Sequence, residues 1–418
     1  MPGALLEQER RRSIPGASTG QTVDGIVKPV FRWTVLLISW LAVTLTFTDR
    51  LAWASVAVEA GRTLGLPVAA LGVFVTAFYS GYVISNAVGG LSSDRFGSER
   101  VMLCSLVPLG LATFGFGFTT SITYGLLMQA IMGLAAGANH AATVKLIVSW
   151  FGLTERGRAM GLLTSANSFG VVLANAIVPS LSVSIGWGGA YNVLGLITSV
   201  FGLAAFLILR HRPAPQAPAP SPRFDPMLVF RNRDLTLLGL AGFCAMWGTW
   251  GVAFWANALM TRQFGMTPVQ AGGLLALFGV AGMVSKPALG FLLDLIGSNK
   301  KKPILICVFT TFAAALIIYS GLDSIGEFTI ATPLLGLVAF IYTPVLVASV
   351  SEVAGPQQTG TAVGITNAIW QLGSVIVPIA IGVVFSATGS FQVAFLALAA
   401  GPLLAALLML PVRYKAAV

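Results

Sequence analysis

Two distant stretches of the chain repeat one pattern of glycine and aspartate. The stretch Gly90–Ser98 reads Gly-Leu-Ser-Ser-Asp-Arg-Phe-Gly-Ser, and it recurs as Gly290–Ser298, which reads Gly-Phe-Leu-Leu-Asp-Leu-Ile-Gly-Ser. Both copies end an apolar stretch and precede cationic residues. Further pairs that keep the same spacing are Arg62, Gly65 and Gly72 with Arg262, Gly265 and Gly272. A chain that repeats itself after nearly half its length is built from two copies of one structural unit.

The composition places both units in a membrane. Hydrophobic residues make up 56% of the 418-residue chain and charged residues only 9%, whereas a soluble domain carries about 25% charged residues. Only helices or closed barrels satisfy the backbone in lipid. The apolar runs are about 20 residues long and do not alternate, so they predict transmembrane helices. We therefore expect an all-α membrane protein that lies in the lipid bilayer.

The apolar runs predict twelve transmembrane helices in two pseudo-symmetric six-helix bundles. The expected spans are 33–57, 68–91, 101–119, 122–149, 157–183, 189–209, 234–260, 268–293, 303–321, 327–351, 360–386 and 391–411. Parallel repeats of membrane helices are typical of transporters, which hold their site between the repeats.

The segments outside the spans complete the predicted organisation. The stretch 210–233 is expected to be a cytoplasmic linker, because its prolines cannot continue a helix. The expected boundaries are 1–32 for a cytoplasmic N-terminal tail, 33–209 for the N-terminal bundle, 210–233 for the linker, 234–411 for the C-terminal bundle and 412–418 for a cytoplasmic C-terminal tail.

The net charge of +10 is placed as in a membrane protein and not as in a nucleic-acid-binding one. With both termini inside, most of the 24 Lys and Arg residues fall into cytoplasmic segments, whereas Arg62 and Arg262 fall outside. This is the positive-inside bias. We therefore predict no nucleic-acid partner. We expect a multi-pass protein of the bacterial inner membrane with both termini in the cytoplasm.

The ionisable residues do not form an enzyme site. The chain has two histidines, His140 and His211, and its spans hold no Ser/His/Asp set, no His-Glu-x-x-His and no paired carboxylates. The three cysteines lack metal-like spacing. We therefore expect no enzymatic activity, no metal and no cofactor. We also expect the protein to act as a monomer.

The first copy of the repeat carries a family motif. Residues 90–100 follow a Gly-x-x-x-Asp-Arg-x-Gly-x-x-Arg pattern that resembles the loop signature of the major facilitator superfamily, and residues 290–297 are a weaker second copy. The resemblance implies alternating access by two rocking halves with a cytoplasmic gate. The residues that it places in the gate are Asp94, Arg95, Arg100 and Asp294. The alternative is that the basic residues only keep this loop inside.

Further stretches resemble narrower families. Phe47–Arg50 and Trp150–Ala159 resemble the anion:cation symporters, which move organic anions such as sugar acids with protons. Ser285–Pro287 is similar to monocarboxylate and oxalate transporters. In those proteins an arginine that meets the substrate carboxylate stands in place of Lys286, so here a point charge replaces a bidentate clamp. Ala136 stands where some anion symporters carry a proton-binding glutamate.

The few charges within the spans are the candidate site residues. An ionisable group at mid-bilayer costs roughly 2.5–3.5 kcal/mol on insertion scales, so it persists where it serves a cavity. We predict that Arg50 and Lys286 bind the substrate anion. We predict that Asp49 and His140 carry the coupled proton, with a hydrogen bond between them as one expected contact.

Structural roles are the alternatives at each of these positions. Asp49 and Arg50 could staple the first span to a neighbour, and a neighbouring group could satisfy His140. Lys286 could pair with Asp294 or reach the cytoplasm. Neutral polar residues complete the predicted substrate cavity, and Asn367 and Gln371 share one helix face. The neutral residues assigned to substrate binding are Asn257, Tyr342, Asn367 and Gln371.

Together these features predict a secondary active transporter that moves a small organic anion with a proton by alternating access. The anion would be a monocarboxylate, a sugar acid or an aromatic acid. An anion that enters alone opposes the membrane potential by about 2.3 kcal/mol per charge per 100 mV, and an accompanying proton cancels this cost. The alternatives are an anion exchanger and a proton-coupled exporter of apolar or cationic compounds, which would use Asp49 as its ligand.

Overall fold

The computed structural model describes residues 29–151, 153–210, 227–296, 300–355 and 358–413. Within these ranges the chain is helical and contains no strand. The long helices are α2 (Pro29–Thr63), α3 (Gly72–Phe96), α4 (Ser98–Phe116), α5 (Ile122–Trp150), α6 (Leu153–Leu209), α8 (Arg233–Arg262), α9 (Pro268–Ile296), α10 (Lys301–Ser320), α11 (Ile325–Ala354), α12 (Thr359–Thr388) and α13 (Phe391–Met409). The short elements are η2 (Val68–Ala70) and α7 (Leu228–Arg231).

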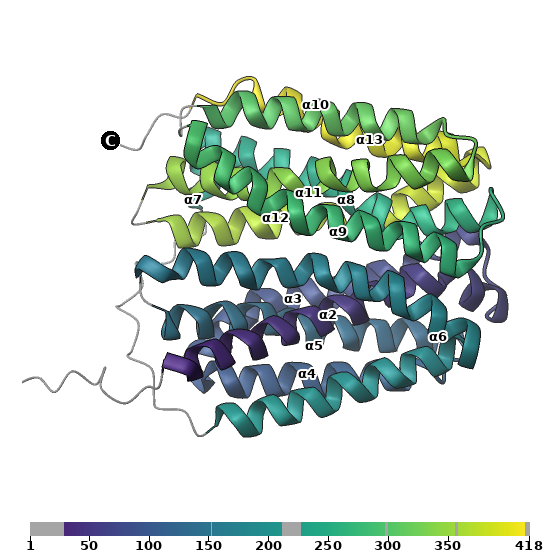
Figure 1. Ribbon diagram of the computed structural model, residues 1–418, viewed down its shortest axis with the longest axis horizontal. Coiled ribbons are helices and arrows are strands. Elements are labelled where there is room, and N and C mark those ends of the chain that lie inside the picture. Colours follow the sequence, from purple (N-terminus) through teal and green to yellow (C-terminus); the bar gives the residue numbers. More distant parts are fainter. Residues whose placement is uncertain (1–28, 152, 211–226, 297–299, 356–357, 414–418) are drawn as a thin grey trace, which may run out of the picture.

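Helix α6 crosses the membrane twice. A straight helix of its 57 residues would be about 85 Å long, far beyond the hydrocarbon thickness of about 30 Å. The chain turns at Gly186, whose φ of 76° and ψ of 160° are readily adopted by glycine alone. Figure 1 shows α6 folding back at one end of the molecule. The predicted spans 157–183 and 189–209 are the two arms of this helix.

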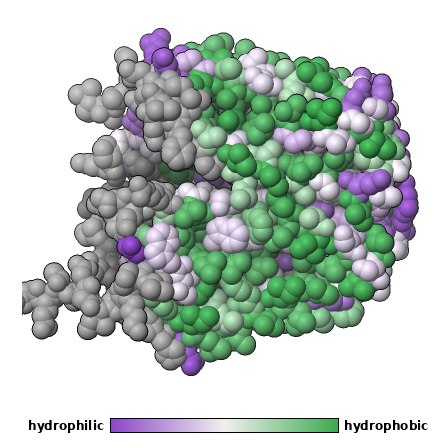
Figure 2. Space-filling model, viewed as in Figure 1, coloured by the Kyte–Doolittle hydropathy of each residue, from purple (hydrophilic) through white to green (hydrophobic). Residues whose placement is uncertain are grey.

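The fold contains twelve membrane-crossing helices. By length and composition, nine helices in the described ranges are apolar enough to span a bilayer, and one of them is the twice-crossing α6. Helices α3 and α5 lie outside that set, but they have 25 and 29 residues and pack among the others. Hydrophobic side chains cover the middle of the molecule (Figure 2). The predicted all-α fold with twelve transmembrane helices is confirmed.

The helices form two bundles that follow the sequence repeat. Helices α2 to α6 make the first bundle, which is purple to teal in the lower part of Figure 1, and α8 to α13 make the second bundle above it. In the first bundle α3 packs on α5, and in the second α9 packs on α11. Glycine permits both close approaches, because Gly133 lies against the carbonyl of Phe78 and Gly336 lies against that of Phe278.

The predicted linker and tails fall largely outside the described residues. Of the linker 210–233, residues 211–226 lie outside, and Leu228–Arg231 form the short helix α7. Residues 1–28 and 414–418 of the predicted tails lie outside as well. The predicted positions of these segments relative to the membrane stay predictions.

Cationic side chains gather at one end of the molecule. This end, on the left in Figure 1, is where α2 begins and α13 ends, and we call it the basic end. Its described cationic residues include Arg32, Arg100, Arg210, Arg233 and Lys302. We call the other end, which carries the turn at Gly186, the opposite end.

The two bundles meet along a seam that is closed at the opposite end. Helix α2 faces α8, α3 faces α12 and α6 faces α9. In the first turn of α3, Gly72 lies against the carbonyl of Pro378. In the first turns of α9, Gly272 lies against the carbonyl of Asn175. The two contacts occupy equivalent places in the repeat, so the seal is itself pseudo-symmetric.

Toward the basic end, two glycines on the seam faces have no described neighbour. One glycine in each bundle lies on the face that forms the seam. Gly161 is two turns before Ser168 on α6, and Gly364 is two turns before Gln371 on α12. These are the faces that meet the other bundle at the opposite end. A Cβ added at either glycine would nevertheless meet no described atom within 4 Å. Among the described residues, no contact between the halves therefore occurs at these two glycines.

Candidate functional site

Arg50 lies in the middle of α2, and aromatic rings surround its guanidinium. The carbon Cζ is 4.3 Å from the ring centroid of Tyr79 and 4.4 Å from that of Trp250. The rings of Phe47 and Tyr82 are 4.9 Å and 5.2 Å away. Only 4% of Arg50 is exposed. Because Trp250 belongs to α8, the enclosure combines side chains of both bundles.

The hydrogen-bonding groups of Arg50 are only partly used. Its Nη2 donates to the hydroxyl of Tyr79. Its Nε and Nη1 are buried without a hydrogen-bond partner among the described residues. No described carboxylate lies within 4.0 Å of the guanidinium. Ring faces stabilise a cation by roughly 0.5–2 kcal/mol each, which does not replace a counter-ion, so Arg50 presents unneutralised positive charge at mid-membrane.

Asp49 is adjacent to Arg50 in sequence but points elsewhere. Its Oδ2 accepts a hydrogen bond of 2.8 Å from the hydroxyl of Thr198, in the second arm of α6. Its Oδ1 is buried without a partner in the described part of the chain, as is the nearby hydroxyl of Tyr191. Neighbouring helix positions diverge by about 100°. The carboxylate therefore faces the interior of the first bundle, and the arginine faces the seam.

Helix α5 places His140 beside this pair. The preceding residue, Asn139, anchors α5 to α2 by donating from Nδ2 to the hydroxyl of Thr46 at 2.9 Å and to the carbonyl of Ala42 at 3.2 Å. His140 is half-buried and close enough to Arg50 for their charges to interact. The described structure contains no hydrogen bond between His140 and Asp49, so that expected contact is not made in this conformation.

Lys286 crosses the seam from the second bundle. Its Nζ donates to the hydroxyl of Ser168, in the first arm of α6, at 3.0 Å. It also lies 5.1 Å from the ring centroid of Phe340. No carboxylate within the described ranges lies within 4.0 Å of it. The side chain of Asp294, its predicted alternative partner, lies outside the described residues.

Arg50 and Lys286 approach the same seam from the two bundles. The Cβ of Phe47 lies against Gly170, which is two residues from the serine that Lys286 contacts. The ring of Phe47 is in turn 6.3 Å from that of Trp250. Both cations that the sequence predicts to bind an anion therefore lie on the seam, linked through Phe47, Gly170 and the same serine.

The predicted neutral residues divide into two groups. Asn257 lies two turns beyond Trp250 on the same face of α8, 2% exposed, and its Nδ2 has no described partner. Asn367 and Gln371 are half-buried on α12. Tyr342 lies inside the second bundle instead, with its hydroxyl 3.0 Å from that of Thr249. The structure does not bring Tyr342 to the seam.

Only Arg100 of the four predicted gate residues has a described side chain. The side chains of Asp94, Arg95 and Asp294 lie outside the described residues, and Arg100 is exposed in the first turn of α4. Two polar contacts join helices near this end. Lys145 donates to the carbonyl of Ser93 at 2.6 Å. Lys301 and Glu352 form an ion pair at 2.5 Å.

The tyrosines and the tryptophan around Arg50 were not predicted as site residues. Tyr79 and Tyr82 are three residues apart on α3, and Trp250 and Phe254 are four apart on α8, so each pair shares a helix face. This spacing was the sequence signal that could have indicated an aromatic surface. It also fits simple packing or an interfacial belt, which is why it does not single out a site.

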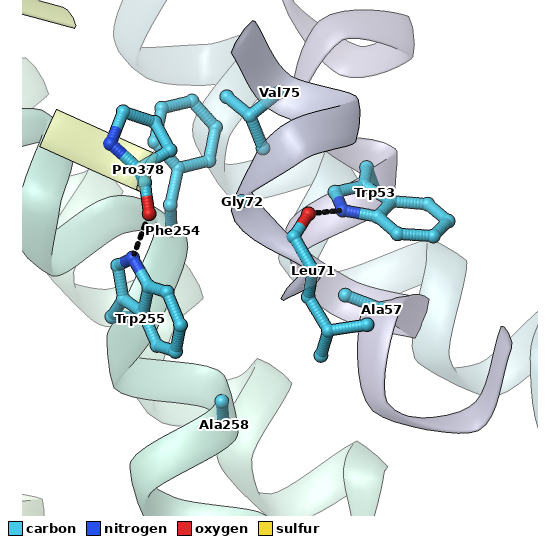
Figure 3. A pocket seen from close by; sticks show the side chains of 9 residues that line it. All are labelled: Trp53, Ala57, Leu71, Gly72, Val75, Phe254, Trp255, Ala258 and Pro378. Carbon is cyan, nitrogen blue, oxygen red and sulfur yellow. Dashed lines mark hydrogen bonds between the residues drawn. The ribbon is translucent and has the colours of Figure 1, made fainter. Parts of the chain in front are cut away.

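A small apolar cavity lies on the seam next to this site, toward the opposite end (Figure 3). Its volume is about 10 Å³, barely room for one water molecule. Its lining residues are Trp53, Ala57, Leu71, Gly72, Val75, Phe254, Trp255, Ala258 and Pro378. The indole of Trp53 donates to the carbonyl of Leu71 at 2.9 Å, and that of Trp255 donates to the carbonyl of Pro378 at 3.3 Å.

Several curated proteins similar to this chain are named as transporters of organic acids. The hexuronate transporter of Bacillus subtilis (strain 168) is 22% identical, with 87% of this chain and 90% of that protein covered. The probable sulfoacetate transporter SauU of Cupriavidus necator is 23% identical with the same coverage of 87% and 90%. The probable galactarate/D-glucarate transporter GarP of Escherichia coli (strain K12) is 24% identical and covers 92% of this chain and 95% of that protein.

Solved structures share the fold. A bacterial homologue of the human lysosomal transporter Spinster, in an inward-facing and occupied conformation, matches with a TM-score of 0.77 at 16% identity, over 91% of this chain and 97% of that one. The D-xylose–proton symporter matches with a TM-score of 0.75 at 17% identity, over 93% and 100%. The family model of the Major Facilitator Superfamily matches residues 38–378 and 238–418. This chain therefore belongs to the Major Facilitator Superfamily, and it is a membrane transporter and not an enzyme.

Proposed function

We propose that this protein is a secondary active transporter that binds a small organic anion between Arg50 and Lys286. The observation that carries the proposal is the state of Arg50, which is buried at mid-membrane with two unused donors and no described carboxylate beside it. An uncompensated buried charge is strongly unfavourable. A substrate carboxylate would supply the missing negative charge and accept hydrogen bonds from these donors.

The relatives support the same class of substrate. Hexuronate, sulfoacetate and galactarate or glucarate, named in the relatives, are all organic anions. Asn257, Asn367 and Gln371 are the polar residues proposed to contact the rest of the substrate. Tyr342 was predicted with them, but its place inside the second bundle suits a supporting role.

Asp49 and His140 are proposed to carry the coupled proton. The side chain of Asp49 points away from Arg50, and its Oδ1 has no described hydrogen-bond partner. Oδ1 can therefore gain or lose a proton while Oδ2 keeps its hydrogen bond to Thr198. His140 lies near Arg50, and its protonation would be sensitive to an anion bound there. Proton symport across the bacterial inner membrane would offset the charge of the entering anion.

Alternating access would follow from rocking of the two bundles. The seam is sealed near Gly72 and Gly272, whereas Gly161 and Gly364 have no described neighbour toward the basic end, and we take the seam to be open there. If the basic end is cytoplasmic, as the positive-inside bias indicates, this conformation faces inward. The gate proposed from Asp94, Arg95, Arg100 and Asp294 would close that end in the other conformation.

Uptake by reconstituted protein tests the proposal. We expect liposomes that contain the protein to accumulate at least one of glucuronate, lactate and benzoate under an inward-directed proton gradient. Arg50→Gln should abolish this uptake, whereas Arg262→Gln, an exposed control at the opposite end, should retain it. Uptake that needs a second anion inside and ignores the gradient would indicate exchange. Proton-driven efflux of cationic compounds that survives Arg50→Gln would refute the anion site.

A further inference from the structure

We infer that the preferred substrate is a monoanion with a flat, apolar body, such as an aromatic monocarboxylate, and that polyhydroxylated sugar acids are disfavoured. The inference rests on the proposed function, since it takes Arg50 as the group that binds the carboxylate. Two features carry it, namely the side chains that enclose Arg50 and the lining of the seam beside them.

The wall around Arg50 offers ring faces and few free polar groups. The hydroxyl of Tyr79 is already used by the guanidinium. The indole nitrogen of Trp250 donates to the sulfur of Met246 at 3.1 Å. Phe47 has no polar atom. The hydroxyl of Tyr82, the remaining polar group of the wall, interacts with Arg50 and Asn86.

The apolar surface continues from Arg50 toward the opposite end. The ring of Trp250 stacks with that of Phe254 at 5.9 Å, and Tyr79 meets Phe254 edge-on at 6.0 Å. Phe254 then lines the cavity of Figure 3 on the same side as Trp255, with Trp53 on the other side. Both indole nitrogens there are used by backbone carbonyls. The surface between the carboxylate anchor and the seal is therefore aromatic and aliphatic.

This surface belongs to both bundles, so the space within it changes with conformation. Trp53 and Val75 come from α2 and α3, whereas Phe254 and Trp255 come from α8. In the present conformation the cavity of about 10 Å³ is too small for any substrate. Separation of the bundles at this end would open it directly beside Arg50.

A sugar acid would bury its hydroxyls against these rings without partners. Each unpaired hydroxyl costs about tenfold or more in affinity, whereas an aromatic ring gains from stacking on Trp250 and Phe254. The amides of Asn257, Asn367 and Gln371 are the neutral polar groups proposed to contact the substrate, and they could serve one or two polar substituents. They are too few for a polyol.

Binding of two probes to the detergent-purified full chain tests the inference. We expect benzoate to bind at least about tenfold more tightly than glucuronate, measured by calorimetry at one pH. Trp250→Leu removes one ring face beside Arg50 and so affects both anions, but it should lower the ratio of benzoate affinity to glucuronate affinity about tenfold. Trp250→Phe, the matched control, should keep that ratio. If Trp250→Leu fails to fold, Phe254→Leu tests the same aromatic surface and should also weaken benzoate binding.

Binding of the two anions to the variants distinguishes the preferred substrate class from anion binding at Arg50 itself. Equal or tighter binding of glucuronate, lost in Arg50→Gln, would overturn the substrate class and leave the anion site standing. Failure of benzoate to bind would also overturn the substrate class. Binding of both anions that is unaffected by Arg50→Gln would overturn the proposed function itself.

Discussion

Lys286 of the second bundle donates a hydrogen bond from Nζ to the hydroxyl of Ser168 in the first bundle, at 3.0 Å. Among the described residues this hydroxyl and the ring of Phe340 are the contacts of the ammonium group, and neither carries a negative charge. A carboxylate that enters the seam can therefore replace the hydroxyl as the partner of the ammonium group. The contact links the charge of the site to the relative position of the two bundles.

Lys286→Gln should weaken anion binding without unfolding the protein. Glutamine can still reach toward Ser168, but it removes the charge, and a charge-assisted hydrogen bond contributes about 1.5–3 kcal/mol. We expect the KM for the transported acid to rise about tenfold to a hundredfold. Lys302→Gln, at the basic end, is the control and should leave KM unchanged. An unchanged KM in Lys286→Gln would favour the exporter alternative.

Arg50→Lys should impair transport nearly as much as Arg50→Gln. A lysine keeps the charge but loses the planar group that stacks between Tyr79 and Trp250. We expect at least a tenfold loss in the ratio of maximal rate to KM. Initial rates of uptake into proteoliposomes measure the effect. Full activity of Arg50→Lys would show that charge alone, without the stacked geometry, suffices at this position.

Asp49→Asn should separate transport from proton coupling. The asparagine oxygen can still accept the hydrogen bond from Thr198, so the fold should persist. Because the amide cannot take up a proton, uptake driven by a proton gradient should fall to background. Exchange of labelled for unlabelled substrate, which needs no net proton movement, should continue. Gradient-driven uptake at the rate of the unmodified protein would assign coupling elsewhere, with His140→Gln as the next variant.

Gly272→Ala should prevent the seam from closing at the opposite end. Its new methyl group would collide with the carbonyl of Asn175, whereas Gly273→Ala, one position later, meets no described atom within 4 Å. We expect a cysteine placed at Ala258 in a cysteine-free background to react faster with a membrane-impermeant maleimide in Gly272→Ala than in Gly273→Ala. Equal reaction rates would show that this glycine does not form the seal.

Gly72→Ala, at the equivalent position of the first bundle, should also prevent the seam from closing at the opposite end. The added Cβ would meet the carbonyl of Pro378, close to where Thr76 donates to the carbonyl of Val375 at 3.0 Å. We expect the same gain in labelling at the Ala258 position. A response at one glycine and not at the other would show that the two seals open independently.

The two candidate cations could be picked out from the sequence, whereas the rings that surround Arg50 could not. Arg50 and Lys286 are conspicuous because few charges occur within apolar spans, and burial of a charge is costly. The aromatic partners carry no such signal, since Tyr79 and Trp250 fit packing or an interfacial belt equally well. Tyr342 shows the converse case, because a polar residue in a span can be satisfied inside its own bundle by Thr249.

The repeat, the low charge and the length of the apolar runs determined by themselves that this chain forms two related bundles with twelve crossings. Each of these features acts locally, through the need of every segment to hide its backbone from lipid. The tertiary structure alone decided that Asp49 turns to Thr198 while Arg50 turns to the seam, and that Lys286 reaches Ser168. Those choices depend on the rotation of each helix against its neighbours, which side-chain packing between distant segments sets and helical periodicity does not encode.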